Sequence, residues 1–202
     1  MKTRNKDVKT VFLSGTDRVA DILHHLHKAL TQFGLDVWLH SEPNFPQLCD
    51  DGMTNCLEVV RRADMMLLII DARSGSPYRK TGHSITEEEF NVAFDNYIPV
   101  FVFVRANILA CSKIYHKHLS EKGAITPEQF SALKLEGDQG VHNFIERIMH
   151  KQRAGEPEIK WTRPFQKDTE IISFIEWLYN SSEGRLRLYK KNDESDLSLI
   201  HI

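Results

Sequence analysis

Cysteine is scarce in this sequence, with three among 202 residues, Cys49, Cys56 and Cys111. An odd number without a regular spacing does not form a disulfide framework, which favours a reducing compartment. A signal peptide and a long apolar run are also missing, so the sequence offers no candidate for a segment that inserts into a bilayer. We therefore expect a cytoplasmic protein without a membrane partner.

An excess of charge of one sign is lacking as well. The 26 Lys and Arg residues nearly balance the 28 Asp and Glu residues, which gives a formal net charge of -2. Such a balance gives no bulk attraction to nucleic acid, so no nucleic-acid partner is expected. The glycine patterns of a Rossmann dinucleotide site and of a P-loop are absent. The histidines lack the spacing of metal ligands, and neither a metal nor a cofactor is predicted.

What the sequence does contain is a regular alternation of short apolar runs and helical patterns. The runs are 8–13, 35–39, 65–70 and 100–104, and a fifth strand is expected at 159–162. The central runs show little alternation of apolar and polar residues, as in parallel strands covered on both faces. Alternating strands and helices predict an α/β, flavodoxin-like, doubly wound fold with a mostly parallel five-stranded sheet. The residues expected at its centre are Val11, Leu13, Leu67, Ile69, Phe101 and Phe103.

The segment after residue 104 contains more helix than one crossover needs. We predict an inserted helical element at about 106–157 within a single domain spanning 8–182, with flexible tails at 1–7 and 183–202. The insertion also has more apolar residues than the sheet needs for its cover, which predicts a homo-oligomer. These apolar residues are Phe130, Leu133, Phe144, Ile145 and Ile148.

The topology also predicts where a ligand binds. In doubly wound sheets, ligands bind beyond the carboxyl ends of the strands, where the strand order reverses. For the order 2-1-3-4-5, this crevice lies between the first and third strands, at residues 14–17 and 71–76. Backbone N–H groups there suit a phosphate, and Gly15 and Gly75 permit its close approach.

The helix expected at 84–97 begins with three successive carboxylates. Ser84 is a good N-cap, and Glu87 is placed to complete a capping box with it. The buried stripe of this helix turns Glu88 outward and leaves Glu87 and Glu89 on its two flanks. Periodicity alone does not choose between these two. The residues of the stripe are Phe90, Ala93, Phe94 and Tyr97.

Several short motifs occur in a fixed order in the first half of the chain. They are Ser14-Gly15-Thr16, Glu42 to Phe45, Cys56-Leu57, Ala63-Asp64, Arg73-Ser74-Gly75 and the segment SITEEEF at 84–90. In this order of motifs, residues 8–105 resemble a bacterial TIR-like family that is often described only as a domain of unknown function. The SITEEEF segment is the most specific match. Gly15 departs from the pattern, because a second hydroxyl residue is usual there.

The resemblance implies both a TIR-like fold and an activity. In the wider TIR group and in nucleoside 2-deoxyribosyltransferases, the catalytic glutamate lies in the pattern E-[ILF]-x-x-A, which residues 89–93 fit. The resemblance therefore identifies Glu89 as the catalytic residue. It implies cleavage of the N-glycosidic bond of NAD or a related nucleotide, with NAD as the substrate and not a cofactor. In bacterial antiphage defence such enzymes produce an ADP-ribose-type signal, and a partner effector protein is a further expectation.

Two alternatives remain open at this stage. A nucleoside 2-deoxyribosyltransferase-like enzyme would use the same glutamate, and a non-catalytic TIR-type module would only bind other proteins. In either enzyme, the reaction passes through an oxocarbenium-like state that an ionised carboxylate stabilises. We expect Glu89 to be ionised at neutral pH, because the start of a helix favours the anion.

The remaining candidates bind substrate. The two aspartates among them suit ribose hydroxyls, the arginine suits a phosphate, and the two aromatic rings suit stacking on a base. The full set of predicted substrate-binding residues is Ser14, Gly15, Thr16, Asp17, Trp38, Phe45, Asp71, Arg73 and Ser84.

Overall fold

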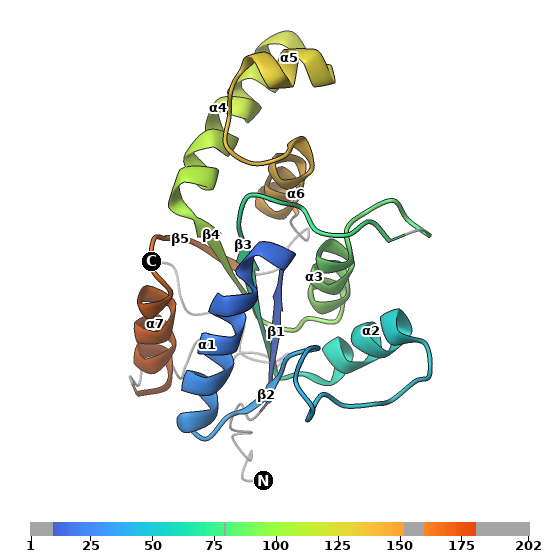
Figure 1. The fold of residues 1–202 in the computed structure, drawn as a ribbon, viewed down its shortest axis with the longest axis vertical. Helices are drawn as coiled ribbons and strands as arrows, with labels where there is room; N and C mark the ends of the chain where they lie inside the picture. The colour runs from blue at the N-terminus through green and yellow to red at the C-terminus, as the bar shows by residue number, and fades with distance from the viewer. Residues whose placement is uncertain (1–9, 79, 152–159, 181–202) are drawn as a thin grey trace, which may run out of the picture.

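A parallel β-sheet forms the centre of the protein (Figure 1). The computed structural model describes residues 10–78, 80–151 and 160–180, without the side chains of residues 17, 160 and 161. Its five strands have the order β2-β1-β3-β4-β5, and every neighbouring pair is parallel. The predicted doubly wound α/β fold is therefore confirmed. The strands are β1 (Thr10–Gly15), β2 (Asp36–Trp38), β3 (Met65–Ile70), β4 (Val100–Arg105) and β5 (Lys160–Phe165).

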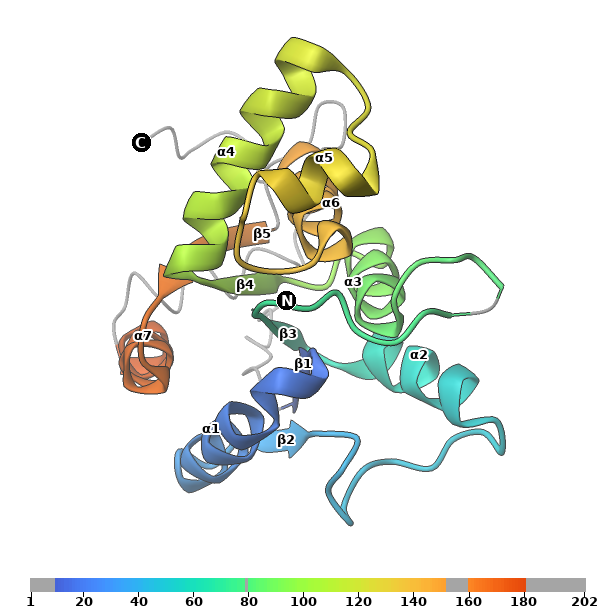
Figure 2. The ribbon, with the colours of Figure 1, turned by 45° about the horizontal axis from the view of Figure 1, so that its top comes forward.

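Helices cover both faces of this sheet, as the turned view in Figure 2 shows. On one face lie α1 (Ala20–Gln32), which follows the short 3-10 helix η1 (Asp17–Val19), and α7 (Asp168–Asn180). On the other face lie α2 (Gly52–Arg62), α3 (Ile85–Asp95) and α6 (Gln139–His150). The core is therefore divided by the sheet into two apolar clusters.

The central strand β3 shows why the sheet is stable. All six of its side chains are buried, and they alternate between the two clusters. Burying one large aliphatic side chain stabilises the fold by roughly 1.5–3 kcal/mol. Leu67 lies in register with Leu13 on one side and Phe101 on the other. The six residues predicted for the centre of the sheet are all buried, so this prediction is confirmed.

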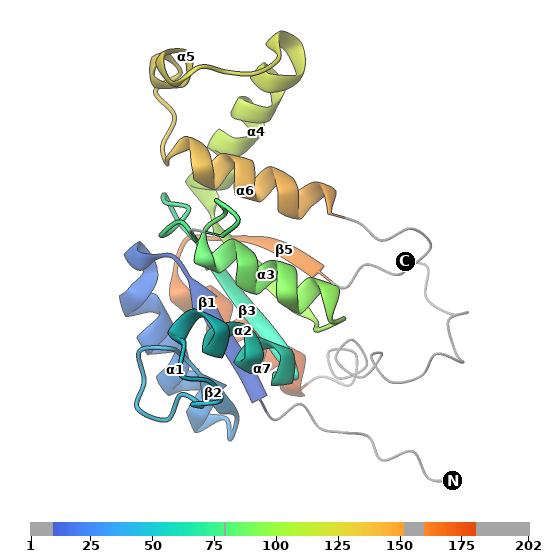
Figure 3. The same ribbon diagram turned by 90° about the vertical axis from the view of Figure 1, so that its right-hand side faces the viewer.

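Among the described residues between β4 and β5 are three helices, α4 (Ala106–Lys122), α5 (Pro127–Ala132) and α6. Figure 3 shows α4 and α5 projecting from the sheet, whereas α6 lies beside α3. Phe144, Ile145 and Ile148 of α6 are buried in the chain's own core, and Phe130 and Leu133 are half-buried. Most of the apolar surface that suggested self-association is thus used within the chain, and the homo-oligomer stays a prediction.

Polar contacts attach α6 to α3. Glu87 of α3 accepts two hydrogen bonds from the guanidinium of Arg147, one of them from Nη2 at 2.7 Å. The Nζ atom of Lys151, which follows α6, donates to Asn91 Oδ1 at 2.7 Å. These bonds join the inserted helices to the helix that holds the predicted catalytic glutamate.

The loop after β3 is covered by the start of α6. The N–H of Asp138 donates to the carbonyl of Ala72 at 2.9 Å, and the Asp138 carboxylate accepts from the N–H of Ser74. A β carbon at Gly140 would lie 2.6 Å from Ser74 Oγ, so glycine is what permits this close approach. The insertion therefore occupies one side of the crevice that the topology predicted.

Some of the sequence predictions fall outside the described residues. These are the tails 1–7 and 183–202, the domain limits at 8 and 182, and the end of the insertion at 152–157. Within the ranges that the structure describes, no helix has both the length and the hydropathy needed to cross a bilayer.

Candidate functional site

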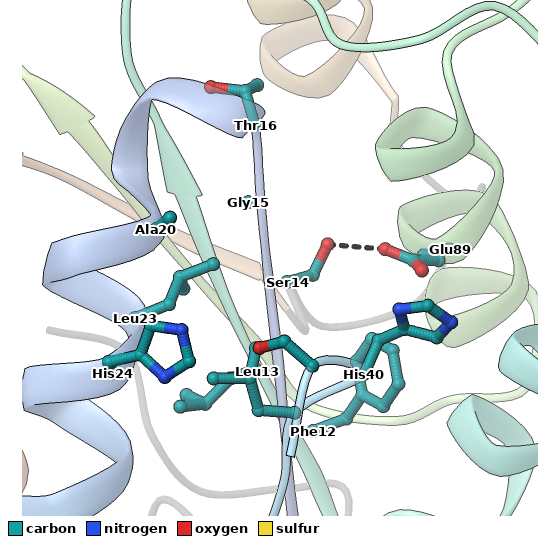
Figure 4. A pocket seen from close by; sticks show the side chains of 12 residues that line it. Phe12, Leu13, Ser14, Gly15, Thr16, Ala20, Leu23, His24, His40 and Glu89 are labelled. Carbon is teal, nitrogen blue, oxygen red and sulfur yellow. Dashed lines mark hydrogen bonds between the residues drawn. The ribbon is translucent and has the colours of Figure 1, made fainter. Parts of the chain in front are cut away.

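A pocket of about 210 Å³ lies at the carboxyl end of β1 (Figure 4). It forms where the first two strands separate, because β2 pairs with β1 only as far as Phe12 and Trp38. The lining residues are 12–16 from β1 and the turn after it, Ala20, Leu23 and His24 from α1, 39–41 after β2, and Glu89 from α3. Both faces of the sheet thus contribute to one pocket.

A hydroxyl–carboxylate pair lies in this pocket. Ser14 Oγ donates a hydrogen bond to Glu89 Oε2 at 2.6 Å, and the two residues are only 3% and 7% exposed. The start of α3 is fixed by Ser84, whose hydroxyl accepts from the N–H of Glu87 at 3.1 Å. This N-cap sets the helical position at which the Glu89 side chain meets β1.

The charge state of Glu89 differs from the prediction. Burial raises the pKa of its carboxyl from the ordinary value of 4.5 to about 7, against the hydrogen bond from Ser14, which lowers the pKa. Glu89 is the fifth residue of α3, and the free N–H groups of a helix belong to its first turn. Its carboxylate therefore gains little from the helix start, and the expectation of full ionisation at neutral pH was wrong.

The other two glutamates of the SITEEEF segment have different partners. The predicted N-cap by Ser84 is present, but the Glu87 carboxylate is bound by Arg147. Glu88 was expected to face solvent, yet it is half-buried, with its Oε1 atom 2.8 Å from His83 Nδ1. The loop after β3 folds back onto this side of α3, which explains the difference. The tertiary contacts thus leave one of the three carboxylates for the pocket.

Four of the predicted site residues meet in the pocket, namely Ser14, Gly15, Thr16 and Glu89. A β carbon at Gly15 would lie 2.6 Å from Val19 Cγ2, which explains why glycine stands where a hydroxyl residue is usual. The buried Thr16 Oγ1 has no hydrogen-bond partner within the described part of the chain. The side chain of Asp17 lies outside the described residues.

The predicted residues after β3 do not line this pocket. Asp71 accepts a hydrogen bond from Arg105 Nε at 2.9 Å, so its carboxylate is bound by the end of β4. Arg73 lies on the loop after β3, and its side chain is exposed to solvent. Ser84 serves as the N-cap of α3. The pocket therefore lies on the β2 side of β1, away from the crevice between β1 and β3.

The two aromatic candidates also lie outside the lining. Trp38 is partly buried against the core, and its ring N–H donates to Asp36 Oδ2 at 3.0 Å. Phe45 is buried behind the pocket, with its ring centroid 6.2 Å from that of Phe12. The Phe45 ring thus supports a wall of the pocket without being part of it.

Sequence reasoning missed three further polar residues that line the pocket, His24, His40 and Ser41. His24 lies one helical turn after Ala20, which places both on the face of α1 nearest the end of β1. This helical spacing is the sequence signal that could have identified His24 as a pocket residue. In the chain as far as it is described, no three of the residues that bind metals gather in a metal-binding group.

The fold and the pocket define an α/β domain with a buried carboxylate at the carboxyl edge of a parallel sheet. Residues 10–175 match the family described as Domain of unknown function (DUF4062). The match covers well over half of the chain, and the protein therefore belongs to this family. Comparisons with curated proteins and with solved structures find no match. The family description names no activity.

Proposed function

We propose that this protein is a TIR-like enzyme that cleaves the N-glycosidic bond of a nucleotide, with NAD as the first candidate substrate. One observation carries the proposal. Glu89, which the resemblance to TIR proteins identifies as catalytic, is the carboxylate that lines the pocket beside Ser14. The other two glutamates of the segment are bound elsewhere.

The chemistry fits a buried carboxylate. Breaking an N-glycosidic bond develops positive charge on the sugar, and a carboxylate in a poorly solvated site stabilises that charge more strongly than one in water. Nicotinamide in NAD is cationic before cleavage and leaves as a neutral molecule, so it needs no proton. A cationic ring near Glu89 also lowers the pKa of its carboxyl from the value of about 7 in the protein alone and restores the anion.

The size of the pocket limits how much substrate it encloses. Its volume of about 210 Å³ is below the roughly 300–1,000 Å³ typical of pockets for drug-sized ligands. It suits one nucleoside, with the remainder of a dinucleotide lying outside at the open edge of the sheet. This observation favours a second candidate, a nucleoside 2-deoxyribosyltransferase-like reaction, since its substrates are single nucleosides.

The biological setting follows from the resemblance alone. TIR-type enzymes of bacteria release ADP-ribose-type signals in antiphage defence, and the proposal extends this role to the present protein. It includes a homo-oligomer as the active form and a partner effector protein that receives the signal.

The direct test is product formation by the purified protein. NAD, and separately a deoxynucleoside with a free acceptor base, are incubated with the protein over a wide range of its concentration, and the products are separated by chromatography. We expect nicotinamide and an ADP-ribose-type product from NAD. Base exchange alone would favour the transferase, and no product from either substrate would favour a non-catalytic module.

The pH dependence reports the role of Glu89. Its raised pKa means that the carboxyl is protonated below about pH 7. If the anion is the active form, kcat/KM for NAD falls about tenfold for each pH unit below that value and is constant above it. Initial rates measured between pH 5 and 9 test this. A rate that instead falls above pH 7 would mean that Glu89 acts as an acid, which contradicts the proposed role.

A further inference from the structure

Two histidine–carboxylate pairs lie next to each other on α1. His24 Nδ1 is 2.8 Å from Glu42 Oε1, and His25 Nδ1 is 2.5 Å from Asp168 Oδ2. The two imidazoles are almost equally exposed, at 48% and 50%. Of these two histidines, His24 lines the pocket and His25 does not. Figure 4 shows it on the α1 side of β1, with Glu89 on the α3 side.

The Glu42 contact gives His24 a defined orientation. When the carboxylate accepts from Nδ1–H, the proton on Nδ1 is held in place. The second ring nitrogen, Nε2, is then available to a substrate in the pocket. A carboxylate in this position also holds the imidazole ring in place, as the aspartate of a catalytic triad does. His40 lines the same pocket, but its ring packs edge-on against Phe45 at 5.4 Å. That contact places the ring of His40 without fixing the position of its proton.

We infer that His24, held by Glu42, is a second catalytic residue of this pocket and transfers the proton that a neutral nucleobase needs in order to leave. The inference rests on the proposed function and extends its substrate class. NAD carries a cationic base, whereas purine and pyrimidine nucleosides carry neutral bases that leave as anions unless they are protonated. The pocket therefore accepts neutral-base nucleosides or nucleotides as well as pyridinium ones.

The step balances with water as the co-reactant. His24 Nε2–H donates its proton to a ring nitrogen of the base as the C1′–N bond breaks. The bonding electron pair goes to the base, which departs as a neutral molecule. The Glu89 carboxylate stabilises the oxocarbenium ion that remains. Water then adds to C1′ and gives its proton to Nε2, which restores the imidazolium for the next cycle.

The role of His24 predicts a difference between two classes of substrate. General acid catalysis contributes typically 10²–10⁴-fold, so removing the acid costs at least about 100-fold for a neutral base. Bond breaking in NAD requires no acid, and its rate changes by less than about tenfold. A merely structural role of His24 lowers both rates alike.

The experiment compares His24→Gln with His25→Gln. Glutamine still donates to the neighbouring carboxylate in each pair, and both side chains are half exposed, so both variants keep the fold. Each is assayed with NAD and with a purine nucleoside. We expect His24→Gln to lose at least about 100-fold in kcat on the nucleoside and less than tenfold on NAD, with His25→Gln like the wild type on both. Glu42→Gln is expected to lose less activity than His24→Gln, with the larger loss again on the nucleoside.

The outcomes separate this inference from the proposed function. A wild type that turns over neither substrate overturns both. A wild type active on NAD alone leaves the proposed function intact and overturns the wider substrate class. An active wild type with unchanged nucleoside turnover in His24→Gln, or with equal losses on both substrates, overturns the role of His24 alone.

Discussion

Glu89→Gln is expected to abolish the cleavage of NAD while leaving the protein folded. The substitution preserves the shape of the side chain and its hydrogen bond with Ser14, whose hydroxyl can accept from the new amide. It removes the negative charge that faces the developing oxocarbenium ion. Loss of a single group that stabilises transition-state charge costs about 10²–10³-fold, and we expect at least about a thousandfold because this charge is central to the reaction.

The same substitution is expected to stabilise the fold above neutral pH. The pKa of the Glu89 carboxyl is about 7 in the folded protein against an ordinary 4.5, so the folded state binds its proton more tightly than the unfolded state. Stability therefore falls as the pH rises from about 4.5 to 7 and stays lower above that range, by up to about 3 kcal/mol. Glutamine carries no charge and removes this cost. We expect Glu89→Gln to melt roughly 5–10 °C higher than the wild type at pH 8 and at about the same temperature at pH 4.

Glu88→Gln is the matched control for both measurements. Glu88 is the preceding residue of the same helix, and its carboxylate lies at the loop around His83 instead of in the pocket. It is expected to keep wild-type turnover and to show no gain in melting temperature at pH 8. Full turnover by Glu89→Gln would show that Glu89 is not catalytic. An unchanged melting temperature at pH 8 would show that the ionised Glu89 carboxylate does not destabilise the folded protein.

Arg147→Ala is expected to destabilise the protein by roughly 2–3 kcal/mol. The side chain of its partner Glu87 is only 4% exposed, whereas that of Arg147 is 48% exposed. Removing one partner of a buried ion pair costs about 3–5 kcal/mol, because the other charge remains buried without compensation. The exposure of Arg147 reduces the expected value, since water already screens part of the pair. Urea unfolding measures the loss.

The partner variant isolates the ion pair from the rest of the contact. Glu87→Gln removes the buried charge itself, so adding it to Arg147→Ala is expected to recover part of the lost stability, and the double-mutant cycle gives the coupling. Lys117→Ala removes a surface pair with Glu121 whose side chains are 77% and 57% exposed. Its effect is expected to stay within about 0.5 kcal/mol. Equal stability of Arg147→Ala and Lys117→Ala would contradict the structural role of the Arg147 pair.

Local patterns predicted the elements of this fold well. The strand at 65–70 was found at its observed position, and the strand predicted at 100–104 is one residue longer; the first strand, predicted at 8–13, instead runs from Thr10 to Gly15. Strands buried on both faces leave a continuous apolar run, which is visible in the local sequence. The start of α3 was found through Ser84, since an N-cap is a contact between residues three positions apart. The second strand was expected to reach Leu39 but ends at Trp38, where the chain turns to form a wall of the pocket.

The site was less predictable for a physical reason. Helical periodicity placed Glu87 and Glu89 on equivalent flanks of one stripe, and the choice between them depends on partners 60 and 75 positions away, Arg147 and Ser14. The charge state of Glu89 depends on burial, which likewise arises only when β1 and α3 pack together.

The sequence by itself therefore determined the parallel sheet, the order of its helices and the segment that holds the pocket carboxylate, because periodicity and capping act over a few neighbouring residues. Only the tertiary structure decided which carboxylate faces the pocket, that the pocket lies on the β2 side of β1, and that His24 stands opposite Glu89. These features depend on how separate elements pack, and no local pattern encodes the distance between residues that meet only in the folded chain.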